Sequence, residues 1–375
     1  MPSDSLALHF PEGQNFTCTS CEKCCRKPWK IKVDRVERES LVELESYKSL
    51  KREGYQPLEV LEENYELARP AEEGCYFLED SLCRIHGEAG ASAKPTVCQL
   101  YPFQLVRSPG GYHISLAFSC PAVIAGVGEQ ASQHREGLRQ IVLEAPYFFP
   151  PDLKPPTEIT LTASYKVSWD SYLALEKALL KELGRSQDLS DTLLGAGAGF
   201  LCHGSRSEEL RARVKKELRE LLPHFVVPMM AAVENPDSPE LQGEFVMRLM
   251  GGVGVDSNLL GSYLESYDRA FSRDQMSREV LHRFVKGQVV GKKLITGPSA
   301  FIRIFYLVCC LEILNFYQAE RARLSEEKHF SMSDLEWCFD LIETELPKFF
   351  SSVLPGIESL ESNFLDFVET STAGT

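Results

Sequence analysis

The stretch FTCTSCEKCC, residues 16–25, places Cys18, Cys21, Cys24 and Cys25 within eight positions. A C-x-x-C pair brings two sulfur atoms to the same side of a tight turn, where both can bind one metal ion. The first three cysteines form two overlapping pairs of this kind, and Cys25 points in a different direction from Cys24. Zinc sites and iron–sulfur clusters both use thiolate ligands at such spacings. The stretch therefore predicts a metal centre.

Further cysteines follow in the same part of the chain. Of the twelve cysteines, eight lie within the first 120 residues. The later ones belong to "GCYFLEDSLCRIH", "KPTVCQLYPF" and "SCP". We predict that these segments fold back onto the opening quartet. His86, three residues after Cys83, could complete a metal site, but a polar turn residue is the simpler interpretation. The eight cysteines of this region are Cys18, Cys21, Cys24, Cys25, Cys75, Cys83, Cys98 and Cys120.

Two other interpretations of these thiols stay open, namely disulfides and buried free cysteines. The N-terminal residues "MPSDSLALHFPEGQNF" contain no basic region followed by an apolar stretch, so no secretory signal is visible. We therefore expect a cytoplasmic protein, in which thiols stay reduced and disulfides are disfavoured. The remaining cysteines lie in apolar helical stretches and are expected to be ordinary core residues. These are Cys202, Cys309, Cys310 and Cys338.

The composition is that of a globular protein with a normal core. The chain has 375 residues, of which 43% are hydrophobic and 25% charged, so it needs no metal merely to make a small fold stable. The net charge of −14 repels phosphate backbones, so we expect no nucleic-acid partner. No membrane span is expected either. The uncharged stretch 108–128 contains proline and glycine, and "FIRIFYLVCCLEILNFY" is interrupted by Arg303 and Glu312.

The sequence pattern predicts an α+β protein. The expected parts are a cysteine-rich metal-binding module at 1–147, a proline-rich linker at 148–158 and an all-helical domain at 159–375. In the module, Asp34 and Glu37 form a capping-box pattern before a helix. Expected strands cover "WKIKVD", "GCYFL" and "YHISLAF". Expected helices cover about 35–50, Pro57 to Ala68, and Pro121 to about Glu144 with interruptions.

The linker is predicted from "YFFPPDLKPPTEIT", whose four prolines prevent a continuous helix. After it, "SWDSYLALEKALLKEL" has apolar residues at helical spacing, with Ser168 as a possible cap. Two glycine-rich stretches, "GGVGVD" at 251–256 and "GQVVGKK" at 287–293, lack the strand context of nucleotide-binding loops. We therefore predict no nucleotide site. Further helices are expected around 206–222, 240–250, 277–290, 299–323 and 333–350.

The segments "FTCTSCEKCC", "GCYFLEDSLCRIH" and "CQLYPF" resemble the CxxCxxCC cysteine cluster family, the YkgJ-type zinc- or iron-chelating proteins. The resemblance covers about residues 16–125. The flagellin lysine N-methylase branch is similar in "CCRKPWKIKVD", in "CRIHGEAGASAKPTVCQLYP" and in "SCP". The family resemblance implies a zinc ion or a 4Fe–4S cluster held by the eight cysteines. The branch resemblance implies S-adenosylmethionine and methyl transfer to lysine side chains of a protein substrate such as flagellin.

Three functional hypotheses follow. The leading one is a metal-binding protein whose iron–sulfur or zinc centre is held by the N-terminal cysteines. The second is an S-adenosylmethionine-dependent protein-lysine N-methyltransferase of the flagellin type. The third is a helical interaction protein with structural zinc. Neither a catalytic residue nor a residue that binds S-adenosylmethionine stands out by spacing, and no Ser/His/Asp or H-E-x-x-H pattern supports hydrolase chemistry.

Overall fold

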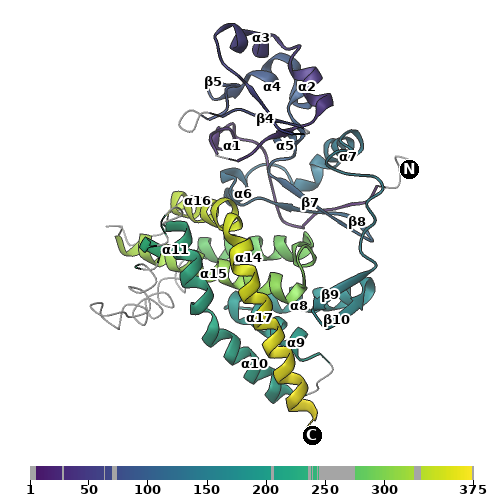
Figure 1. Ribbon diagram of the computed structural model, residues 1–375, viewed down its shortest axis with the longest axis vertical. Helices are drawn as coiled ribbons and strands as arrows, with labels where there is room; N and C mark the ends of the chain where they lie inside the picture. The colour runs from purple at the N-terminus through teal and green to yellow at the C-terminus, as the bar shows by residue number, and fades with distance from the viewer. Residues whose placement is uncertain are drawn as a thin grey trace.

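The structure, a computed structural model, describes residues 6–27, 29–62, 64–69, 74–203, 207–234, 238, 240–242, 244, 275–324 and 331–373. It is an α+β protein, as predicted. Small sheets occupy the first half of the chain, and helices make up most of the second half (Figure 1). The cysteine-rich part lies at one end of the molecule, and the long helices extend away from it toward the C-terminus (Figure 1).

The cysteine-rich part is built from short elements around a small hydrophobic core. Buried Ile31, Val33, Leu67 and Phe77 form the centre of this core. Its antiparallel sheet has the order β2–β4–β3 and consists of β2 (Lys32–Val33), β4 (Tyr65–Leu67) and β3 (Leu58–Val60). Its helices are α1 (Lys23–Arg26), α2 (Arg35–Leu41), α3 (Glu45–Arg52), α4 (Arg84–Ala89), η2 (Ala91–Ala93) and α5 (Thr96–Leu100).

The capping box predicted at Asp34 is present at the start of α2. The single helix expected over 35–50 is in fact two helices, because the chain bends after Leu41. The second of them, α3, begins where the Glu88 carboxylate accepts hydrogen bonds from the backbone N–H groups of Glu45 and Ser46, at 2.6 and 2.9 Å. A carboxylate at this position satisfies the unpaired donors of a helix N-terminus. The capping residue belongs to α4, so the sequence around α3 alone could not predict this cap.

The helix predicted from Pro57 to Ala68 is wrong. These residues form strands β3 and β4, which pair with each other, and β4 also pairs with β2. Pairing with a distant strand buries Leu67, and this burial outweighs the local helical preference. The "GCYFL" strand is displaced as well. It begins only at Leu78, in the hairpin of β5 (Leu78–Glu79) and β6 (Leu82–Cys83).

A central sheet lies between the cysteine-rich part and the helices (Figure 1). The predicted turn at Pro109–Gly110 joins two antiparallel strands, and the N-terminal β1 adds to them in parallel at Tyr112 and His113. Interrupted helical segments follow Pro121, as predicted. The strands are β1 (Leu8–His9), β7 (Phe103–Ser108) and β8 (Gly111–Leu116), and the helices are α6 (Pro121–Ala125), η3 (Ala131–His134) and α7 (Arg135–Glu144).

The C-terminal part is mainly helical but begins with a hairpin, β9 (Glu158–Thr162) and β10 (Tyr165–Ser168), that the pattern did not predict. Ser168 caps the next helix, as expected. Most of the predicted 240–250 helix and all of 251–256 fall outside the described residues. The helices are α8 (Trp169–Leu183), α9 (Leu189–Leu201), α10 (Glu208–Leu221), α11 (Pro223–Glu234), α14 (Gln275–Val290), η4 (Lys293–Ile295), α15 (Ala300–Leu324), α16 (Met332–Asp340), the π-helix η5 (Leu341–Glu345) and α17 (Leu346–Ala373).

One large hydrophobic core runs from the central sheet into these helices. It buries Cys202, Cys309, Cys310 and Cys338, which confirms them as core residues. Within the described residues, Ala300–Gln318 of α15 is long and apolar enough to cross a membrane, yet 83% of it is buried in the protein. The core helix of a globular protein has the same properties. The boundaries at 147 and 158 stay a prediction, and core contacts extend across them.

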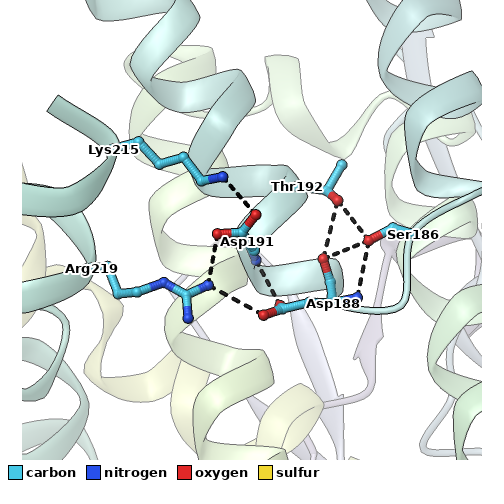
Figure 2. A network of polar contacts seen from close by, with 6 residues as sticks. All are labelled: Ser186, Asp188, Asp191, Thr192, Lys215 and Arg219. Atoms are coloured by element: carbon cyan, nitrogen blue, oxygen red, sulfur yellow. Dashed lines mark hydrogen bonds and ion pairs between the residues drawn. The ribbon is translucent and has the colours of Figure 1, made fainter. Parts of the chain in front are cut away.

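A polar network on the surface joins α9 to α10 (Figure 2). Asp188 caps α9, and Asp191 lies one turn further along. Both carboxylates pair with Arg219, at 3.2 and 2.9 Å, and Asp191 also pairs with Lys215 at 2.5 Å. All four side chains are between a third and somewhat over half exposed, so water screens these pairs. The network orients the two helices and adds little stability.

Candidate metal centre

The opening cysteine stretch folds into a tight knot around α1. Ser20 and Glu22 adopt left-handed backbone conformations, with φ of 54° and 55°. The Glu22 carbonyl then accepts a hydrogen bond from the Cys25 N–H at 2.7 Å. Left-handed φ in residues other than glycine costs free energy and tends to occur at functional sites. In this chain it reverses the backbone between successive cysteines, as a C-x-x-C ligand turn requires.

A second segment docks directly on this knot. The Cys75 N–H donates to the Cys25 carbonyl at 2.9 Å. Such close approach depends on Gly74, which has φ of +82° and whose missing Cβ would lie 2.7 Å from the same carbonyl oxygen. The tip of the following hairpin is also held, because the Ser81 hydroxyl donates to the Glu22 carboxylate at 2.6 Å. Sequence reasoning did not identify Gly74, although a glycine directly before a cysteine was a usable signal.

The thiols of Cys24 and Cys25 lie side by side and share a hydrogen bond. This hydrogen bond, with help from the positive charge of Lys94, lowers the pKa of Cys24 to about 6. The pKa of Cys25 is raised in return, because it donates that hydrogen bond and is partly buried. Two interacting groups lose their protons in separate steps, and here the proton leaves Cys24 before Cys25. The thiolate form, which binds metal, is therefore favoured at Cys24.

Three more thiols surround the pair. Burial raises the pKa of Cys75 and of Cys98, and the charges of neighbouring cysteines raise both further. Cys83 is one of these neighbours, and its charge also raises the pKa of Cys25. Repulsion among thiolates is the electrostatic condition that a bound cation relieves. We call Cys24, Cys25, Cys75, Cys83 and Cys98 the five-thiol group.

The other three predicted ligands are placed differently. Cys120 precedes α6 and is buried in the large core, and burial raises its pKa to about 11. The charges of Cys21 and Cys24 contribute to this rise, so Cys120 lies near the knot. Cys18 and Cys21 are exposed. The structure thus brings five predicted ligands together, places Cys120 and Cys21 beside them, and leaves Cys18 at the surface.

The cations near the thiols are not those next to them in sequence. Arg26 pairs with Glu22 at 2.6 Å, and Lys27 is turned toward the helical part. The charge of Arg69 instead lowers the pKa of Cys75, and its guanidinium donates to the carbonyls of Cys24 and Cys25. Lys94 acts similarly on Cys24 and Cys98. No sequence motif pointed to Arg69, which follows β2, β3 and β4 in the chain.

The donor set fits a thiolate-bound metal in its chemistry. All eight N-terminal cysteines are free thiols, so the disulfide alternative is not realised. His86 is exposed and gives no sign of a ligand role. Among the described residues, no three His, Cys, Asp or Glu side chains already have the geometry of a metal site. The sulfur atoms must therefore move closer together to bind a metal.

Residues 17–121 match the family model CxxCxxCC. This family is described as "Putative zinc- or iron-chelating domain". An uncharacterized protein of Methanocaldococcus jannaschii is 36% identical over 117 residues, which cover 31% of this chain and 39% of the relative. This chain therefore matches less than half of the relative's length. No solved structure matches the chain.

The comparisons support zinc or iron chelation by the cysteine-rich part. They do not reach the helical part, and they say nothing of S-adenosylmethionine, methyl transfer or flagellin. The methyltransferase hypothesis therefore remains a prediction without support from these matches. The cytoplasmic location and the absence of nucleic-acid and membrane partners also stay predictions.

Proposed function

We propose that the cysteine-rich part holds an iron–sulfur cluster, with four ligands drawn from the five-thiol group. The supporting observation is that Cys24 lies within electrostatic range of thiols from three other segments, at Cys75, Cys98 and Cys120. One zinc ion needs only four ligands, and this group offers five thiols with no histidine among them. A thiol-only set of this size suits a cluster better than a single zinc ion.

A cluster in this place would supply one-electron chemistry or redox sensing. The protein contributes positive charge through Arg69 and Lys94, which offsets the thiolates. It also contributes an aromatic wall, because the rings of Trp29 and Tyr101 meet edge to face at 4.5 Å. Tyr101 lies close enough to Cys24 and Cys120 for their charges to raise its pKa. This wall limits the access of water and oxygen to the thiols.

The test is metal and sulfide analysis of protein purified without oxygen. We expect iron with an equal amount of acid-labile sulfide, and absorbance at about 400 nm. Cys24→Ser should lose most of the iron, whereas Cys202→Ser, a buried cysteine in the helical part, should keep it. Stoichiometric zinc without sulfide would reject the cluster but keep metal binding. No metal at all under these conditions would reject both.

A further inference from the structure

A second polar site lies in the helical part, away from the cysteine knot. It is a cavity of about 210 Å³ between β7, α14, η4, α15 and η5. In Figure 1, α14 and α15 lie below β7 of the central sheet. Its apolar surface includes Phe284, and its polar residues include Gln288, Lys293, Arg303, Tyr306 and Glu343. Apart from Glu343, which accepts a hydrogen bond from the backbone N–H of Ser119 next to Cys120, none of these residues has a role in the metal centre described above.

Two cations face this cavity without an acidic partner at ion-pair distance in the described part of the chain. The Arg303 Nε–H donates to the Lys293 carbonyl at 3.3 Å, and the guanidinium lies over the rings of Tyr306 and Phe350, at 5.6 and 5.5 Å from their centroids. The loop at Gly297 presses against the Arg303 stem, since a Cβ there would lie 2.6 Å from Cδ. Arg303 is therefore fixed in position rather than free to turn toward solvent.

The carboxylate that faces the cavity is already engaged. Glu343 accepts a hydrogen bond from the Ser119 backbone N–H at 2.6 Å. Burial raises its pKa, so its negative charge is disfavoured in this place. Burial and the charge of Arg303 also lower the pKa of Lys293 to about 8. Positive charge in the cavity is thus only partly neutralised by the protein.

A hydroxyl group completes the arrangement. The Tyr306 ring is buried, and its hydroxyl has no nitrogen or oxygen partner in the described structure, with only the weakly bonding thiol of Cys310 beside it. Burying such a group costs free energy unless a ligand or water binds it. A cation pair, an unsatisfied hydroxyl, an amide and an aromatic wall together match an anionic head group on an apolar body.

We propose that this cavity binds a small carboxylate, with Arg303 and Lys293 holding the carboxylate group, Tyr306 donating a hydrogen bond to it, and Phe284 packing against its apolar part. The volume is about seven times the roughly 30 Å³ that one water molecule occupies in the liquid, which suits a small ligand. Nucleotides and peptides are too large. The site is independent of the proposed metal centre, and failure of either proposal leaves the other standing.

The test is calorimetric titration of the full chain with acetate, butyrate and benzoate, each compared with its neutral amide. We expect at least one carboxylate to bind with a Kd below about 10 mM. We also expect its amide to bind at least tenfold more weakly. Arg303→Met and Lys293→Met should each weaken binding tenfold or more. Lys286→Met, an exposed change on α14 outside the cavity, should leave binding unchanged.

Tyr306→Phe gives a second, independent test. It removes a hydroxyl that has only the Cys310 thiol as a partner, so the protein should fold nearly as well as the original, while carboxylate affinity falls severalfold. The proposal is overturned if none of the three carboxylates binds. It is also overturned if the amides bind equally well, or if binding survives both Arg303→Met and Tyr306→Phe in protein shown to be folded by circular dichroism.

Discussion

Replacing Gly74 by alanine tests whether the approach of two chain segments builds the metal centre. At φ of +82° an alanine costs about 1–2 kcal/mol. Its Cβ would also lie 2.7 Å from the Cys25 carbonyl, roughly 0.7 Å short of the 3.4 Å at which ordinary contact begins. Moving the segment that far would break the 2.9 Å hydrogen bond from Cys75, a loss of about 0.5–1.5 kcal/mol. We expect a destabilisation of about 2–3 kcal/mol.

The effect on metal content should be larger than the effect on stability. The sulfur atoms must come closer together to bind a metal, and a shift of roughly 0.7 Å that carries Cys75 away from Cys25 opposes this approach, so most bound metal should be lost. Gly54→Ala is the matched control, because Gly54 has φ of +92° but its Cβ would meet nothing within 4 Å. The assays are urea unfolding and elemental analysis of both variants. If Gly74→Ala retained full metal and matched Gly54→Ala in stability, the docking of Cys75 on Cys25 would not be what builds the site.

Three further outcomes are expected. Glu176→Gln should destabilise the fold by about 3–5 kcal/mol in urea unfolding, because it leaves the buried Lys292 ammonium without its ion-pair partner. Asp191→Asn, in the exposed network of Figure 2, should cost under about 1 kcal/mol in the same assay, and a larger loss would contradict the screening argument. Calorimetry should show a carboxylate affinity for the cavity that is constant below pH 8 and falls above it. Above pH 8 the free Lys293 has lost its proton, and because a bound anion raises the pKa of Lys293, binding must then take up a proton. The other titratable groups facing Lys293 are Arg303, Tyr306 and Cys310 of α15 and Glu343 of η5.

The fold class and the helices of the second half were predictable, because apolar spacing and caps are local signals. Ser168 and Asp34 cap the helices that the sequence assigned to them. Prediction was wrong where a distant partner decides the conformation. Residues 57–68 become strands only because β2 pairs with β4, and α3 starts only where Glu88 arrives from α4. Neither partner can be read from the segment itself.

For the candidate site, spacing identified the thiols but not their surroundings. Cysteine type and number are written in the sequence, whereas the distances between thiols depend on how four separate segments pack. The basic run after Cys25 suggested cations for the centre, yet Lys27 turns away to Asp340, and Arg69 takes the place near Cys75. The cavity residues were equally hidden. Lys293 and Arg303 are ten positions apart and meet only because the η4 loop folds onto α15.

The backbone contacts of one residue, Ser119, indicate that the helical part shapes the metal centre. The Ser119 carbonyl accepts a hydrogen bond from Lys27 at 3.0 Å, and the Ser119 N–H donates to Glu343 at 2.6 Å. Lys27 follows the α1 cysteines, Ser119 precedes Cys120, and Glu343 belongs to the π-helix η5. Lys27 is only 6% exposed and also pairs with Asp340, so moving it out of place would leave a buried charge unpaired. The α1 cysteines before Lys27 and Cys120 after Ser119 are therefore positioned by contacts with two acidic residues of the C-terminal half, Asp340 and Glu343. The metal chemistry of the chain should thus depend on residues far outside 17–121.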